Sequence, residues 1–174
     1  MEFRAVTRLT TQRYLQYGWP NLSSHTHTTV VTIAGNEPAE PAQQIALIWF
    51  RLTDFASWAE WVPRTSAAVT LDAGAIGRGT RFRLETSFGS ELWQVSYWDA
   101  GKRVIFQVHT DRRRWACAIE TRKGESGQVE VVLEFEFEVS GLRRGISPLS
   151  KWLDRRRARS FADALSAWLQ SAGL

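Results

Sequence analysis

The segment from Gly127 to Ser140 restricts the fold more than any other part of the sequence, because its residues alternate between apolar and acidic. One side of the alternation carries Val129, Val131, Leu133, Phe135, Phe137 and Val139. The other side carries Glu130, Glu134, Glu136 and Glu138, with Val132 as its apolar exception. A two-residue period of this kind predicts a β-strand with one buried and one solvated face. The buried face requires a large apolar partner elsewhere in the chain.

The last helix is the natural partner of that face. After the turn residues 141–145 the apolar period becomes helical, so Ser147–Ala172 is predicted to form one long helix, with Ser147 as its N-cap before Pro148. Its stripe at three- and four-residue spacing consists of Leu153, Arg157, Phe161, Ala164, Leu165, Trp168 and Ala172. Because a sheet is the only large surface that the rest of the sequence predicts, we expect this stripe to lie on it.

The remaining elements are short and separated by turn residues. We predict a strand over residues 27–34, a helix over 42–52, a second short helix over 54–61 that Asp54 caps, and strands over 67–72, 80–88, 91–98, 103–110, 113–122 and 128–140. Short connections favour antiparallel neighbours, so the six consecutive strands predict a curved meander. The predicted fold class is α+β, with a curved antiparallel sheet around the C-terminal helix. Residues 1–26 are predicted to be an irregular arm, and residues 27–174 one domain.

The composition excludes several classes of protein. Hydrophobic residues make up 44% of the chain and charged residues 23%, as in ordinary globular domains. The one cysteine, Cys117, excludes an intrachain disulfide, and its place inside a predicted strand indicates a buried, inert thiol. No apolar run approaches about 20 residues and the N-terminus lacks a hydrophobic signal segment, so we expect a cytoplasmic protein.

Three stretches resemble the START-like superfamily, also called SRPBCC, which shares its helix-grip fold with the birch pollen allergen. Asp54–Pro63 (DFASWAEWVP) resembles the D-F-x-x-W-x-x-W-x-P segment of the bacterial polyketide cyclase/dehydrase and lipid-transport group. Ile76–Arg83 (IGRGTRFR) resembles the G-x-G-T-x-F-R segment of the same group, and the helix over 148–170 is typical of it. From the residues alone, the tryptophans of the first segment seat the short helices on the sheet, and Gly77 and Gly79 form a turn.

The resemblance, which covers residues 28–174, implies a seven-stranded antiparallel sheet wrapped around the C-terminal helix, with two short helices between the first two strands. It also implies a hydrophobic cavity, but no catalytic residue, because the family has no catalytic signature common to its members. The expected lining is Phe82, Leu84, Trp93, Val95, Tyr97, Phe106, Trp115, Leu133, Phe135, Arg157, Phe161 and Leu165. Phe88 is expected on the same inward face as Phe82, and the side of the strand over 103–110 is left open. The alternative is that these side chains fill a solid core.

Arg157 is the sharpest single observation. It interrupts the apolar stripe of the last helix four residues from both Leu153 and Phe161. On that face a guanidinium would meet a carboxylate or a carbonyl of a ligand. The alternatives are that the side chain extends to solvent at the edge of the helix, or pairs with an acid on a neighbouring element.

Other chemistries have weaker support in the sequence. His25 and His27 have no second cluster of ligands, so no metal site is expected, and no cofactor is predicted. Between Leu142 and Arg159 there are seven Lys/Arg against one Asp, a local charge of +6 in a chain of net charge +4. This run favours a solvated helix face over nucleic-acid binding, and the further interpretation is a transient contact with an anionic membrane surface.

The sequence therefore predicts a carrier or sensor that binds a hydrophobic lipid or polyketide-like molecule between sheet and helix. The alternative is a polyketide cyclase/dehydratase (aromatase) type of enzyme, in which Arg157 or Tyr97 would polarise a carbonyl or relay a proton. A second alternative is an interaction module without a ligand.

Overall fold

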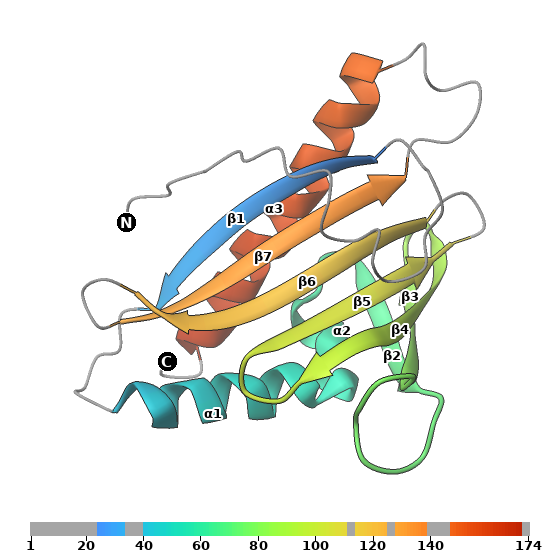
Figure 1. The fold of residues 1–174 in the computed structure, drawn as a ribbon. Helices are drawn as coiled ribbons and strands as arrows, with labels where there is room; N and C mark the ends of the chain where they lie inside the picture. The colour runs from blue at the N-terminus through green and yellow to red at the C-terminus, as the bar shows by residue number, and fades with distance from the viewer. Residues whose placement is uncertain (1–23, 34–39, 111–113, 125–127, 139–146, 172–174) are drawn as a thin grey trace.

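The computed structural model describes residues 24–33, 40–110, 114–124, 128–138 and 147–171. Its elements are β1 (Ser24–Ile33), α1 (Pro41–Thr53), the 3-10 helix η2 (Phe55–Ser57), α2 (Trp58–Trp61), β2 (Thr65–Thr70), β3 (Arg81–Thr86), β4 (Gly89–Asp99), β5 (Arg103–His109), β6 (Arg114–Lys123), β7 (Val129–Glu138) and α3 (Ser147–Ser171) (Figure 1). Each predicted element is present within a few residues of its expected ends. Most of the predicted arm, residues 1–26, lies outside the described residues, and the first strand begins at Ser24 rather than His27.

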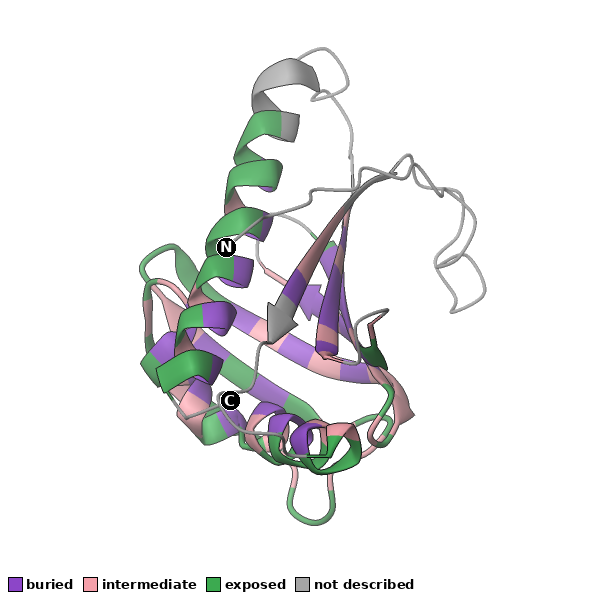
Figure 2. Ribbon diagram, turned by 90° about the vertical axis from the view of Figure 1, so that its left-hand side faces the viewer, coloured by how far each residue is buried: buried purple, intermediate pink, exposed green. Residues whose placement is uncertain are grey.

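The seven strands form one antiparallel sheet in the order β1-β7-β6-β5-β4-β3-β2. Strands β2 to β7 follow one another as the predicted meander, and β1 pairs with β7, with Val31 opposite Val131. The helices contact the concave side: α1 contacts β6 and β7, α2 contacts β2, and α3 contacts β1 and β7. The predicted α+β fold, with a long C-terminal helix held by a curved sheet, is confirmed (Figure 2). In the described part of the chain, no helix is long and apolar enough to cross a membrane.

Strand β7 shows the predicted alternation. Val129, Val131, Leu133, Phe135 and Phe137 are fully buried on the concave side. The acidic side faces outward, where Glu134 pairs with Arg103 at 2.9 Å and Glu130 pairs with Arg122 at 2.9 Å. Such pairs near the surface contribute little stability each, so the alternation acts through the burial of its apolar side. Val139 lies outside the described residues.

Helix α3 is rotated relative to the predicted stripe. Its buried side consists of Asp154, Ala158, Phe161, Ala162, Leu165, Ser166 and Leu169. Leu153, expected inside, has 48% of its surface exposed, and Arg157 lies at the edge with 30% of its side chain exposed. The small side chains of Ala158 and Ala162 allow the helix backbone to approach the sheet, and Leu153 and Arg157 then lie outside the centre of the contact. Ala172 lies outside the described residues.

The prediction that Tyr97 shares the inward face of Trp93 and Val95 is wrong. The register of β4 against β5 shifts between Val95, which lies opposite Phe106, and Tyr97, which lies opposite Ile105. Phe106 faces the helices and Ile105 the convex side, so the extra residue in β4 turns Tyr97 to the convex side. Trp98 instead points inward, with its ring 5.3 Å from that of Trp49 in α1.

Two further expectations fail at chain reversals. Phe88 is 70% exposed, because β3 ends at Thr86 and the chain turns back at Gly89, whose φ of 115° belongs to the left-handed region. Asp54 makes no side-chain capping bond; its carbonyl oxygen accepts one from the Ser57 hydroxyl at 2.7 Å. Alternation and capping patterns no longer predict the placement or the contacts of a side chain where the backbone leaves its regular conformation.

Candidate functional site

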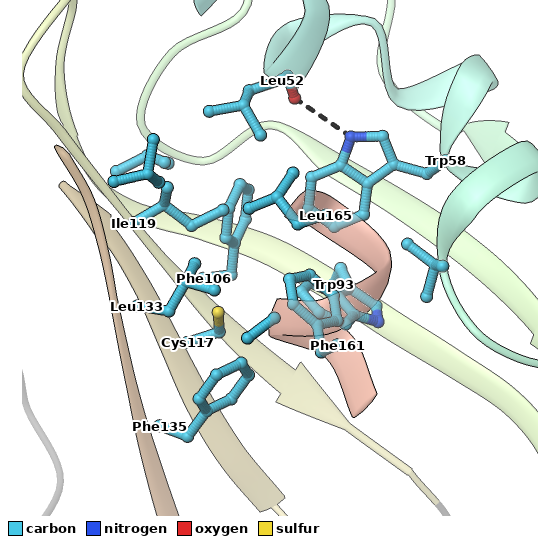
Figure 3. Close-up of a cluster of buried hydrophobic side chains, with 14 of the residues drawn as sticks. Leu52, Trp58, Trp93, Phe106, Cys117, Ile119, Leu133, Phe135, Phe161 and Leu165 are labelled. Carbon is cyan, nitrogen blue, oxygen red and sulfur yellow. Dashed lines mark hydrogen bonds between the residues drawn. The ribbon is translucent and has the colours of Figure 1, made fainter. Parts of the chain in front are cut away.

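An aromatic cluster centred on Trp58 fills the space between α2, the sheet and α3 (Figure 3). The Trp58 indole N–H donates to the carbonyl oxygen of Leu52 at 3.1 Å, which fixes the ring under the end of α1. The rings of Phe82, Trp93 and Phe106 lie 5.1 to 5.4 Å from it, each edge-on. The short helices are therefore seated on the sheet through this tryptophan, as the sequence predicted.

The cluster continues across the sheet to β7. Trp93 and Trp115 meet edge-on with ring centroids 4.9 Å apart, and Phe161 of α3 lies 5.5 Å from Phe135 of β7. At the other end, Trp168 stacks on Trp61 at 5.2 Å. The rings that were expected to contact a ligand thus contact one another in the described part of the chain.

Ten of the twelve predicted lining residues lie together on the concave side, each at most 5% exposed: Phe82, Leu84, Trp93, Val95, Phe106, Trp115, Leu133, Phe135, Phe161 and Leu165. The inward placement of Phe106 also decides the side of β5, so Gln107 and His109 point to the convex face. Tyr97 lies on that face too, and Arg157 stands at the border of the cluster. Most of the predicted lining residues therefore belong to one buried cluster, in which their side chains pack against one another.

A charged node lies at this border. The Arg157 guanidinium donates to the Oε1 atom of Glu91, whose side chain is 5% exposed. The Oε2 atom of Glu91 accepts from the Trp93 indole at 3.1 Å. The Cζ atom of Arg157 also lies 4.6 Å from the ring centroid of Trp115, within range of a cation–π contact. The node joins α3 to β4 and carries no net charge.

One polar group beside the charged node has no hydrogen-bond partner among the described residues. The indole N–H of Trp115 is buried and has no acceptor among the described residues. A buried donor without an acceptor costs free energy, so it favours any molecule that brings an acceptor to it.

The arrangement of sheet, helices and core matches solved structures of low sequence identity. A START superfamily protein from Mycobacterium smegmatis matches with a TM-score of 0.60 and 18% identity over 86% of this chain and 98% of that protein. Ara h 8.0201 matches with a TM-score of 0.59 and 12% identity over 86% of this chain and 99% of that protein. The major latex-like protein 151 of Panax ginseng matches with a TM-score of 0.59 and 12% identity over 84% of this chain and 97% of that protein. The chain has the helix-grip fold of START-like proteins. No family model and no curated protein matches its sequence.

Within this helix-grip fold, Glu91 is the site residue that the sequence analysis missed. It stands two residues before Trp93 in β4, so alternation places it on the same inward face. An acid on an otherwise apolar strand face was the available signal, and its partner Arg157 interrupts the apolar stripe of α3 in the same way.

Cys117 lies in the middle of the helix-grip core, as predicted. Its side chain is fully buried, and burial raises the pKa of the thiol, an effect that the nearby Arg157 charge partly opposes. Because the thiolate is the nucleophilic form, Cys117 is inert at neutral pH.

The glycine motif of the fold serves the turn before β3. Gly79 has a φ of 95°, and its N–H donates to the carbonyl oxygen of Val95 at 2.7 Å. Asp72 accepts from the Arg81 guanidinium at 2.7 and 3.1 Å, and this hydrogen bonding holds the pKa of the Asp72 carboxyl below its usual value. An open surface depression of about 370 Å³ is lined by Asp72, Gly79, Thr80, Arg81 and Gln94. The contacts hold the loop in place, and the structural interpretation of the motif stands.

Proposed function

We propose that the protein binds a hydrophobic small molecule, a lipid or a polyketide-like compound, between the sheet and α3, as its carrier or sensor. START-like folds commonly bind hydrophobic ligands, which supports the class of function. The single observation that carries the proposal is the charged node of Glu91 and Arg157 at the border of an aromatic interior. An apolar site with a few polar groups at one end is the usual design of a ligand site.

The node also favours one kind of ligand head. Because Arg157 is already paired with Glu91, a carboxylate brought to the guanidinium would lie beside a second negative charge. A carbonyl or hydroxyl head avoids that repulsion, since a carbonyl accepts from Arg157 or from the Trp115 indole, and a hydroxyl donates to Glu91. We therefore propose a neutral, carbonyl- or hydroxyl-bearing hydrophobic ligand.

Binding would require the aromatic contacts between α3 and the sheet to open. Phe161 has ring contacts with Trp58, Trp61, Trp93 and Phe135, at centroid distances of 5.0 to 6.3 Å. A ligand that enters here displaces this ring from three tryptophans. The emission of the protein should therefore report binding directly.

The experiment pairs identification with titration. Native mass spectrometry of the protein purified from its own host should show a co-purified small molecule. Sterols or aromatic polyketides should then change tryptophan emission saturably and fatty acids, which carry a carboxylate head, should bind more weakly. Phe161→Leu should alter both the response and the affinity. Trp152→Phe removes an exposed tryptophan and is the matched control, which should keep the affinity. If no compound binds with a Kd below about 1 mM, at which binding is only about 4 kcal/mol, the proposal fails.

The packing of the rings favours the interaction module as the second candidate. Leu47 and Phe50 expose 46% and 75% of their surface on α1, so the chain also offers apolar contact area outside the core. An unchanged emission with every ligand class, together with a stable protein partner, would support it. The enzyme alternative is tested by turnover of a polyketide-like substrate, with Arg157 as its remaining candidate on the concave side.

A further inference from the structure

The N-terminal half of α3 carries a basic and apolar outer face. Arg155, Arg156 and Arg159 are exposed, and so are Trp152 and Leu153, at 52% and 48%. The one acid between residues 152 and 160 is Asp154, which is turned inward and only 3% exposed. The outer face is therefore positive without an intervening exposed acid. Figure 2 shows these turns exposed along the visible side of α3.

A second exposed aromatic residue stands close in the sequence to Glu91, the partner of Arg157. The ion pair between Arg157 and Glu91 holds this part of α3 against the beginning of β4. Phe88, 70% exposed, lies in the turn that leads into β4, three residues before Glu91. The Arg64 guanidinium lies 4.9 Å from the Phe88 ring centroid, and that of Arg156 lies 5.5 Å from the Trp152 ring centroid. Each of these two exposed aromatic rings is thus accompanied by an arginine.

We propose that this face, defined by Trp152, Leu153, Arg155, Arg156 and Arg159, docks on a bilayer surface that contains anionic phospholipids. The arginines would bind headgroup phosphates, and the apolar side chains would enter the boundary between headgroups and acyl chains. Tryptophan and arginine both suit that boundary, because each combines an apolar body with a polar end. The docking does not depend on a ligand in the interior.

The aliphatic component distinguishes a bilayer from a nucleic acid. Arginines and an exposed tryptophan would also suit a phosphate backbone with stacked bases. Leu153, however, is a large aliphatic side chain on the same face, and it has nothing to stack with. It gains free energy in the acyl boundary, where apolar surface leaves water. The observations therefore favour a lipid surface.

The test uses the full chain and vesicles of two compositions. Flotation should recover the protein with vesicles of phosphatidylcholine that contain about 30% phosphatidylserine, and far less of it with phosphatidylcholine alone. Each arginine near an anionic surface contributes about a factor of 5 to binding, so Arg155→Gln, Arg156→Gln and Arg159→Gln together should weaken partitioning about 100-fold. The matched control neutralises three exposed cations elsewhere, Arg78→Gln, Lys102→Gln and Lys123→Gln, and should keep most of the binding.

Two further measurements complete the test. Trp152→Ala should weaken binding at low and at high salt, whereas the contribution of the arginines should vanish near 1 M salt, where the Debye length is about 3 Å. The proposal is overturned if the wild-type protein does not bind anionic vesicles, or if the triple variant binds them as well as the wild type does. So does equal loss in the control variant, because binding would then follow net charge alone. Tight binding of DNA or RNA without vesicle binding would assign the face to nucleic acid instead.

Discussion

Replacement of Arg157 by leucine tests the node most directly. The variant leaves the Glu91 carboxylate, 5% exposed, with the Trp93 indole as its donor in the described part of the chain. Removal of one partner from a fully buried ion pair costs about 3 to 5 kcal/mol of stability. Arg157 is 30% exposed, so water will reach the carboxylate through the space it leaves, and we expect about 2 to 3 kcal/mol.

Thermal unfolding measures this loss. For a chain of this size, 1 kcal/mol shifts the Tm by about 2 to 4 °C, so Arg157→Leu should lower it by roughly 5 to 10 °C. The double variant Glu91→Gln/Arg157→Leu removes the unpaired charge and should recover more than half of the loss. A double-mutant cycle with Glu91→Gln alone should give a coupling free energy of at least about 1 kcal/mol. A Tm unchanged within about 1 °C, or additive effects in the cycle, would refute the role of the pair.

The same variant also separates the proposed functions. If Arg157 contacts the head of a ligand, carbonyl-bearing probes should lose about 1 to 3 kcal/mol of binding and apolar probes almost none. If the pair is structural only, affinity should stay constant while the Tm falls. In an enzyme, turnover should fall more than affinity, because the guanidinium would contact charge that develops in the transition state.

Two further predictions concern the framework around the site. Thr121→Val should lower the free energy of unfolding by about 1 to 3 kcal/mol, because the buried Trp49 indole loses the hydroxyl acceptor that it now has at 2.8 Å. The control variant Thr121→Ser keeps that hydroxyl and should lose less stability. Equal losses in the two variants would contradict the role of this hydrogen bond. Truncation after Leu142 removes α3 and uncovers large apolar residues worth about 1.5 to 3 kcal/mol each, which together exceed a typical stability of about 5 to 15 kcal/mol. The truncated chain should not fold in solution, and a well-dispersed NMR spectrum would contradict this.

Elements with one uninterrupted period were predictable from local sequence. The alternation of β7 identifies its buried side residue by residue, because a strand places successive side chains on opposite faces and acids avoid the apolar one. The boundaries of the other strands were predictable from the glycines in the turns between them. The place of β1 beside β7 was not predicted, because pairing between the two ends of the chain leaves no local pattern.

Local deviations in the backbone account for two of the errors at the site. One extra residue near Ser96 reverses the side of Tyr97, and no feature of the sequence marks that bulge. Phe88 continues the alternation in the sequence, but the hydrogen-bonded strand ends at Thr86. Both errors arise from extending a periodic pattern beyond the point at which the backbone is regular.

The rotation of α3 has a different origin. Leucine at 153 and aspartate at 154 suggest that Leu153 is buried, yet the structure buries Asp154 and exposes Leu153. Close approach to the sheet requires small side chains at the contact, and Ala158 and Ala162 provide them on the side of Asp154. Around Ala158, side-chain size therefore matters beside hydrophobicity in deciding which side of the helix faces the sheet.

Glu91 and Arg157 show that two charged residues on opposing apolar faces can be recognised from the sequence as partners. Each charge stands on a face whose other residues are apolar, one on a strand and one on a helix expected to cover that strand. A charge on such a face is tolerated when an opposite charge meets it, because desolvation of a single ion is far more costly than burial of a hydrogen-bonded pair. The outward acids Glu130 and Glu134 of β7 carry no such information, since arginines on the same convex face pair with them. The pair could therefore have been inferred from the sequence by matching the one inward acid of β4 to the one arginine in the stripe of the last helix.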